Sequence, residues 1–165
     1  MTPQRILFVC LGNICRSPAA EGVLRTIAEQ EGIEHLFEID SAGTYGGHAG
    51  ESSDYRMREA AFTRGYSLTH RSRQITEEDL LHFDRIIVMD DNNLRDVERI
   101  APTPESRAKI ERFANLVTQI PDIHYVPDPY YEGREGFHRV LDILEDGCRN
   151  LLAFAHREQE VGSDR

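Results

Sequence analysis

Residues 5–18 read RILFVCLGNICRSP, an apolar run followed by a polar turn that ends in proline. The run after Arg5 is continuously apolar, which is typical of a strand buried on both faces. Pro18 suits the first turn of a helix and Gly32 suits its end. Between them the residues that share one helical face are Ala20, Val23, Leu24, Ile27 and Ala28. The stretch therefore predicts a buried strand, a tight loop and a helix.

Further strands and helices are expected to alternate along the rest of the chain. We expect further strands at 36–40, 85–90 and 109–113, and helices at 55–64, after Thr76, around Leu94 to Ile100, and at 135–156. Alternating strands and helices imply one α/β domain with a parallel sheet and right-handed crossovers. Ligands of such sheets bind at the carboxyl ends of the strands, and Cys10 lies at such an end.

Composition narrows the class of protein. The 165 residues fit one domain, which we expect to span 1–158, with 159–165 as a polar, disordered tail. The formal net charge of −10 disfavours a nucleic-acid partner and docking on anionic membranes. The apolar run at 6–10 is too short for a signal peptide, and three cysteines fit a reducing compartment. A cytoplasmic protein is the expectation.

The cysteines of the first loop admit several interpretations. Cys10 and Cys15 are spaced Cys-x4-Cys without a second pair, and no histidines stand at ligand spacing, which disfavours zinc. A transient disulfide and a buried, inert Cys10 are the alternatives. However, Arg16 follows Cys10 after five residues, and Ser17 and the helix start come next. This combination favours an anion site.

A strand-to-helix loop of this length can turn its backbone N–H groups inward, and with the helix N-terminus they bind an anion. Gly12 permits backbone conformations closed to other residues, and Asn13 can adopt a left-handed one. Arg16 offers a planar fork for two phosphate oxygens. The same donors stabilise a thiolate, so we expect Cys10 to be deprotonated at neutral pH, with Ser17 donating to it as a leaving group.

Residues 127–131 read PDPYY and offer an acid for the departing oxygen of a phosphate ester. The two prolines stiffen the backbone around Asp128 and bias it to an extended form. Tyr130 and Tyr131 follow and can wall an aryl substrate. We therefore expect Asp128 to act together with Cys10 and Arg16.

The sequences VCLGNICRSP, DSAGT, VMDDNN and DPYY occur in this order, and the chain resembles the low-molecular-weight protein tyrosine phosphatase family over about residues 5–156. The resemblance implies a flavodoxin-like sheet of four parallel strands, order 2-1-3-4, with helices on both faces and no metal or organic cofactor. It implies hydrolysis of phosphotyrosine in proteins and of small aryl phosphates, with inorganic phosphate as product and inhibitor. Cys10 would attack phosphorus, and Asp128 would protonate the leaving phenolate and then activate water. Phosphate would be bound by the Arg16 side chain and by the backbone of Leu11, Gly12, Asn13, Ile14, Cys15, Arg16 and Ser17.

The resemblance also assigns supporting roles. The family's bracing network maps onto Asn13, Ser17, Ser41 and His70, with an ordinary surface position as the alternative for His70. Cys15 matches the family's second cysteine, which can form a disulfide with the nucleophile. Cys148 lies in the apolar stripe of the last helix and is expected in the core. The cleft would be lined by Ile14, Tyr45, Tyr130 and Tyr131.

The chain departs from the family in residues 43–52, GTYGGHAGES. Relatives usually carry a large residue near Gly47 that forms one wall of the cleft. Here Gly46 and Gly47 are flanked by Tyr45 and His48. Either Tyr45 supplies the wall from a shifted position, or the cleft is wider and the loop mobile.

Three other functions share parts of this pattern. Thioredoxin-coupled arsenate reductases of this fold need further cysteines near the third strand, and residues 80–92 contain none. Protein arginine phosphatases of the family typically have threonine in place of Ile14 and lack the tyrosine pair. A redox-sensing, phosphate-binding protein without activity is disfavoured because Cys10, Arg16 and Asp128 are all present. Phosphotyrosine hydrolysis is the expected activity.

Overall fold

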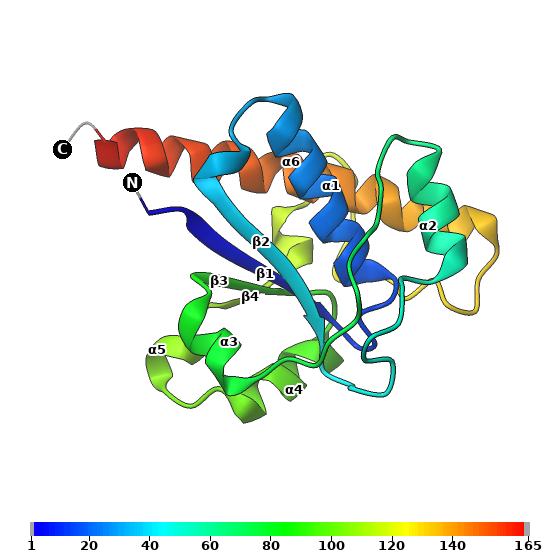
Figure 1. Cartoon of the computed structure of the whole chain (residues 1–165), viewed down its shortest axis with the longest axis horizontal. Helices are drawn as coiled ribbons and strands as arrows, with labels where there is room; N and C mark the ends of the chain where they lie inside the picture. Colours follow the sequence, from blue (N-terminus) through cyan, green and yellow to red (C-terminus); the bar gives the residue numbers. More distant parts are fainter. Residues whose placement is uncertain (1, 164–165) are drawn as a thin grey trace.

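Four parallel strands form one sheet in the order β2-β1-β3-β4 in the computed structural model, which describes residues 2–163 (Figure 1). This confirms the predicted order. The strands are β1 (Gln4–Cys10), β2 (Phe37–Gly43), β3 (Arg85–Val88) and β4 (Ile110–Arg112). Strand β2 runs further than predicted and pairs Gly43 with Cys10. Its last residues are small or polar, so hydropathy alone did not reveal them.

Helices cover both faces of the sheet, as predicted (Figure 1). One face carries α1 (Arg16–Gln30) and α6 (Arg134–Ser163), with α2 (Tyr55–Phe62) beside α6. The opposite face carries α3 (Glu77–His82), α4 (Asp91–Ile100) and α5 (Pro104–Arg107). The sequence did not predict α5 or the two 3-10 turns, η1 (Glu34–Leu36) and η2 (Phe113–Leu116), because such short elements carry too few residues to show a period.

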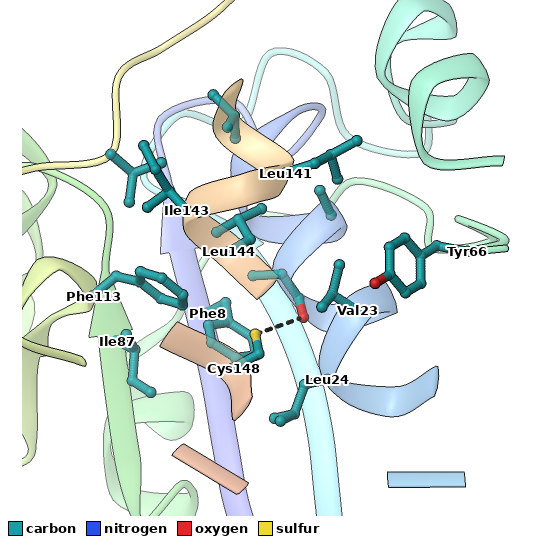
Figure 2. Close-up of a cluster of buried hydrophobic side chains, with 14 of the residues drawn as sticks. Phe8, Val23, Leu24, Tyr66, Ile87, Phe113, Leu141, Ile143, Leu144 and Cys148 are labelled. Atoms are coloured by element: carbon teal, nitrogen blue, oxygen red, sulfur yellow. Dashed lines mark hydrogen bonds between the residues drawn. The ribbon is translucent and has the colours of Figure 1, made fainter. Parts of the chain in front are cut away.

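Strand β1 supplies both hydrophobic cores through the alternation of its side chains. Ile6 and Phe8 enter the core under α1 and α6, whereas Leu7 and Val9 enter the core under α3 and α4. Figure 2 shows the first core, in which Phe8, Val23, Phe113 and Leu144 meet between the sheet and the helices. Cys148 belongs to it as predicted, is fully buried, and donates to the Ala20 carbonyl oxygen at 3.7 Å (Figure 2). Strand β1 is thus packed on both faces, and this packing fixes the start of the loop that follows it.

The last helix is longer than predicted. Helix α6 continues to Ser163, past the expected end at 156 and into the segment 159–165 that we expected to form a polar tail. Residues 157–160, REQE, are strong helix formers and can extend a helix that packing has already nucleated. Residues 164 and 165 lie outside the described residues, and the domain limit at 158 stays a prediction. None of the helices within residues 2–163 is long and apolar enough to cross a membrane.

Candidate active site

The loop between β1 and α1 lies at the carboxyl ends of the strands. Strand β1 ends at Cys10 and α1 begins at Arg16, with Cys15 at the N-cap and no side chain capping the helix. Among the described residues, the backbone N–H groups of residues 11–17 find no protein acceptor. Seven adjacent free donors at a helix N-terminus favour an anion. The geometry therefore fits the predicted phosphate cradle.

Two residues of this loop make its tight curvature possible. Asn13 has φ of 56°, the left-handed conformation that the sequence predicted for it. Gly12 does not use the conformational freedom of glycine, because its φ is not positive. Its small size serves instead, because a Cβ there would lie 3.1 Å from Cδ2 of His48. Gly43 of β2 is similarly constrained, since a Cβ would lie 2.7 Å from the Leu11 carbonyl oxygen.

Cys10 forms the floor of the loop. Its side chain is 2% exposed, and Sγ lies 3.0 Å from the Ser17 hydroxyl oxygen. A hydroxyl that donates to this sulfur stabilises the thiolate form and also a thiolate that leaves. Ser17 thus has the contact predicted for it.

Asn13 joins the floor of the loop to a buried polar network. Its Nδ2 donates to Ser17 Oγ at 2.7 Å and to Ser41 Oγ at 3.0 Å. Its Oδ1 lies 2.7 Å from Nε2 of His70, whose Nδ1 lies 3.2 Å from Oε1 of Glu21. The structure therefore brings together the four predicted bracing residues, and His70 is not an ordinary surface residue.

Glu21 belongs to this network and was not predicted. Its Oε1 accepts from the Ser41 hydroxyl at 2.8 Å, and its side chain is buried. The signal was present, because Glu21 lies four residues after Ser17 and three before Leu24, on the buried face of α1. A carboxylate at a core-facing position needs partners, and here they are the Ser41 hydroxyl, the His70 imidazole and the Arg25 guanidinium, which donates to Oε2 at 3.0 Å.

The cluster of Glu21, Asp40 and His70 also resembles a metal-ligand set, because one ligand atom from each lies within 4.8 Å of the others. In this structure Nδ1 of His70 already faces both carboxylates, at 3.2 Å from Glu21 and 3.5 Å from Asp40. Arg73 also donates to Asp40 from Nε at 3.2 Å and Nη2 at 3.0 Å. These contacts account for the charges without an ion.

Arg16 is buried at the first turn of α1, with its side chain 3% exposed. Its Nη1 donates to Asp90 Oδ2 at 2.7 Å and to the Val126 carbonyl oxygen at 2.9 Å, while Nη2 lies 3.7 Å from Asp128 Oδ2. Burial alone would lower the pKa of Arg16, but interactions with Cys10 and with the Asp90 carboxylate outweigh it and raise the pKa. Asp90 lies in the sequence VMDDNN and caps the N-terminus of α4, but the sequence did not show that it orients the arginine.

Asp128 lies across the pocket from the loop and faces the guanidinium of Arg16. The Tyr130 backbone N–H donates to Asp128 Oδ1 at 3.1 Å, which leaves Oδ2 on the side of Arg16. The side chain is 46% exposed, so protons can exchange with solvent. The structure therefore brings Cys10, Arg16 and Asp128 to one pocket, although they come from distant parts of the chain.

The pocket has a volume of about 260 Å³ and combines the loop with aromatic walls. Its lining contains Cys10, Leu11, Gly12, Ile14, Cys15, Arg16, Tyr45, His48, Asp128, Tyr130 and Tyr131. All four predicted cleft residues are therefore present. The rings of Tyr130 and Tyr131 meet edge to face with centroids 4.9 Å apart. An aryl group whose phosphate lies in the loop would pass between such walls.

The Tyr45 ring lies directly beside Gly47. A Cβ at Gly47 would lie 2.1 Å from Cζ and from Oη of Tyr45, so the tyrosine ring fills the space that a side chain there would need. The ring also meets the His48 ring edge to face, with centroids 5.8 Å apart. Of the two expectations for this loop, the shifted wall is the one that the geometry supports.

Cys15 has a different environment from Cys10. Burial raises the pKa of the Cys15 thiol, and the charges of Asp54 and Cys10 raise it further. Burial likewise raises the pKa of Cys148. All three cysteines are free. At neutral pH Cys15 and Cys148 are therefore neutral thiols.

Comparison with known proteins finds a matching family, named relatives and a solved structure of the same fold. The family described as "Low molecular weight phosphotyrosine protein phosphatase" matches residues 5–162. A Streptomyces coelicolor protein named "Low molecular weight protein-tyrosine-phosphatase" is 42% identical over 160 residues, 96% of each chain. The Homo sapiens "Low molecular weight phosphotyrosine protein phosphatase" is 40% identical over 154 residues, 93% of this chain and 96% of the human one. A crystal structure of a protein tyrosine phosphatase from Entamoeba histolytica superposes with a TM-score of 0.90 at 41% identity, covering 94% of this chain and 99% of that chain.

Proposed function

Because this chain belongs to the low molecular weight phosphotyrosine protein phosphatase family, we propose that Cys10, Arg16 and Asp128 carry out the hydrolysis of phosphotyrosine here. The observation that carries the proposal is their convergence on one pocket, with Arg16 facing Asp128 and Cys10 beneath them. The family and its activity as a cysteine-dependent hydrolase were both predicted from the sequence.

In the first step the Cys10 thiolate attacks the phosphorus atom in line with the ester oxygen. A P–S bond forms as the P–O bond to the tyrosine ring breaks, and Asp128 gives its proton to the departing phenolate oxygen. Arg16 and the free N–H groups of residues 11–17 hold the three equatorial oxygens and the charge on them. Asp90 keeps the guanidinium in place by a bond of 2.7 Å.

In the second step water replaces the cysteine. Asp128, now a carboxylate, takes a proton from water as the water oxygen attacks phosphorus and the P–S bond breaks. The electron pair returns to Cys10, which leaves as a thiolate stabilised by the Ser17 hydroxyl at 3.0 Å. Asn13 fixes this hydroxyl through its own bond of 2.7 Å. The product is inorganic phosphate, which binds in the same loop and should inhibit competitively.

The aromatic walls favour an aryl substrate. The thiolate lies at the floor of a pocket walled by Tyr45, Tyr130 and Tyr131, with Ile14 in the loop. A planar ring of the length of tyrosine gains contact with these side chains while its phosphate reaches the floor. Phosphoserine has a shorter side chain and no ring, so it cannot make these contacts while its phosphate lies in the loop. We therefore propose phosphotyrosine in proteins as the substrate.

A substrate panel tests this function. Phosphotyrosine, phosphoserine, phosphoarginine and arsenate are offered, without added metal, to the wild type, Cys10→Ser and Asp128→Ala. We expect turnover of aryl phosphates by the wild type and none by Cys10→Ser. Asp128→Ala should lose most of its rate on phenyl phosphate and much less on nitrophenyl phosphate, whose leaving group needs little protonation. Activity that survives in Cys10→Ser, or faster turnover of phosphoarginine or arsenate than of phosphotyrosine, would contradict the proposal.

We also propose that Cys15 protects Cys10 from irreversible oxidation. Peroxide oxidises the Cys10 thiolate to a sulfenic acid, and the Cys15 thiol then displaces water to form a disulfide that thiols can reduce. The neutral, buried thiol of Cys15 is not itself the first target. We expect peroxide to inactivate the wild type reversibly and Cys15→Ser irreversibly. Full recovery of the Cys15→Ser variant by thiols would count against this role.

The remaining proposals concern the binding partners, the cellular location, the domain limits and cofactors. A formal net charge of −10 supports our proposal that phosphoproteins, rather than nucleic acids, are the partners. The three free thiols support a cytoplasmic location. We propose that the catalytic domain spans 1–158, and that no cofactor takes part.

A further inference from the structure

Arg56 joins two loops of the site, although it lies outside the phosphate loop and does not line the pocket that contains Cys10. It stands in the first turn of α2, where its Nε and Nη2 donate to the two carboxylate oxygens of Asp54 at 3.1 and 2.9 Å. Its guanidinium carbon lies 5.1 Å from the centroid of the Tyr130 ring and 4.8 Å from that of Phe137. The cation is thus held between two aromatic faces and a carboxylate.

Asp54 connects this arginine to the phosphate loop. The Asp54 backbone N–H donates to the Ile14 carbonyl oxygen at 2.7 Å, and its carboxylate caps α2 by accepting from the Arg56 backbone N–H at 2.9 Å. Burial raises the pKa of Asp54, but the bonds from Arg56 outweigh it and lower the pKa. The carboxylate is therefore ionised at neutral pH, and a two-point ion pair keeps the guanidinium in one orientation.

Tyr130 connects the same arginine to the acid. Its ring faces the guanidinium, and its backbone N–H donates to Asp128 Oδ1 at 3.1 Å. Phe137 forms the other side of the stack. It is 1% exposed and belongs to the core, so its ring is held in place by packing. A loop that carries an exposed catalytic carboxyl gains a fixed position from such a contact.

We propose that Arg56 is a positioning residue: its stacking on Tyr130 holds residues 127–131 against the phosphate loop, so that Asp128 faces the leaving oxygen. This role rests on the proposed function of Asp128. A cation over an aromatic ring contributes enough for a change of about 2- to 30-fold in a rate that depends on the geometry it fixes. The effect should appear only where the acid is needed.

The test compares Arg56→Met with Arg99→Met. Methionine retains an apolar chain but removes the guanidinium, and Arg99 is a matched control on α4, 74% exposed and paired with Asp96 at 3.3 Å. We expect Arg56→Met to lower kcat/KM for phenyl phosphate by about 2- to 30-fold and to leave dinitrophenyl phosphate within about twofold. Arg99→Met should match the wild type on both. The inhibition constant for inorganic phosphate should not change, because the loop itself is intact.

The same substitution in the Asp128→Ala background decides between positioning and general damage. If Arg56 acts through Asp128, Arg56→Met should cause no further loss on phenyl phosphate once the acid is gone. A loss that multiplies that of Asp128→Ala, or an equal loss on both esters, would overturn the positioning role. Failure of the proposed function would look different, since Asp128→Ala alone would then show no preference for the better leaving group.

Discussion

Tyr45 and Gly47 act as one unit in the wall of the cleft, and this coupling can be measured. In a Gly47→Ala variant the new Cβ would lie 2.1 Å from Cζ and Oη of the tyrosine, so the ring must leave its position. The ring can do so at little cost, because Tyr45 is 55% exposed. We expect the free energy of unfolding to change by no more than about 0.5 kcal/mol.

The cost should appear in catalysis. An aromatic pair contributes about 0.5–1.5 kcal/mol beyond the area it buries, and the substrate ring loses such a contact when the tyrosine swings away. That free energy corresponds to a fall of about 2- to 12-fold in kcat/KM for an aryl phosphate. The phosphate loop is unaffected, so inhibition by inorganic phosphate should stay the same.

The assay measures kcat/KM for nitrophenyl phosphate in Gly47→Ala, Tyr45→Ala and the double variant. Both single variants should lose activity to a similar degree, and the double variant should lose no more than Tyr45→Ala alone. A Gly47→Ala variant with wild-type activity would refute this account of the wall, provided that Tyr45→Ala is impaired. Losses that multiply in the double variant would refute it equally.

Three further predictions concern reactivity and stability. Iodoacetate at neutral pH should alkylate Cys10 and spare Cys15 and Cys148, whose pKa values burial raises, and peptide mapping after brief labelling checks this. Leu144→Ala opens a cavity in the fully buried core and should lower the free energy of unfolding by about 2–5 kcal/mol, measured by urea denaturation. Burial alone would raise the pKa of Asp54, but its contacts with Arg56 outweigh burial and lower the pKa. The contribution of this carboxylate to the free energy of unfolding is therefore present above the unfolded carboxyl pKa of about 3.9, and it is lost as the pH falls through the lowered folded value. Asp54→Asn should therefore weaken the acid-side fall in stability, and an unchanged pH profile would argue against this ion pair.

The fold was predictable where a signal is local and repeated. The run after Arg5 and the periodic stripe of α6 each contain enough apolar residues to show their period, and strand order followed from the resemblance. The left-handed Asn13 was predictable because few residue types adopt that conformation. The close approach of His48 to Gly12 was not predictable, because the two residues are distant in sequence.

The site was predictable where the reacting atoms lie in motifs, and less so where they depend on partners. Asp90 and Glu21 are single carboxylates whose roles appear only when folding brings Arg16 to one and His70 to the other. Likewise, no local pattern shows that Arg56 would meet the ring of Tyr130, because the two residues lie far apart in the chain. Such contacts are properties of the tertiary structure.

Trapping the covalent intermediate tests the central claim most directly. Asp128→Ala is mixed with dinitrophenyl phosphate, which transfers its phosphoryl group without an acid, and the reaction is stopped by rapid denaturation. Loss of the base slows hydrolysis, so phosphate should accumulate on the enzyme, and mass spectrometry should locate it on Cys10. Phosphate on any other residue, or continued turnover with Cys10 unmodified at every quench time, would contradict the account.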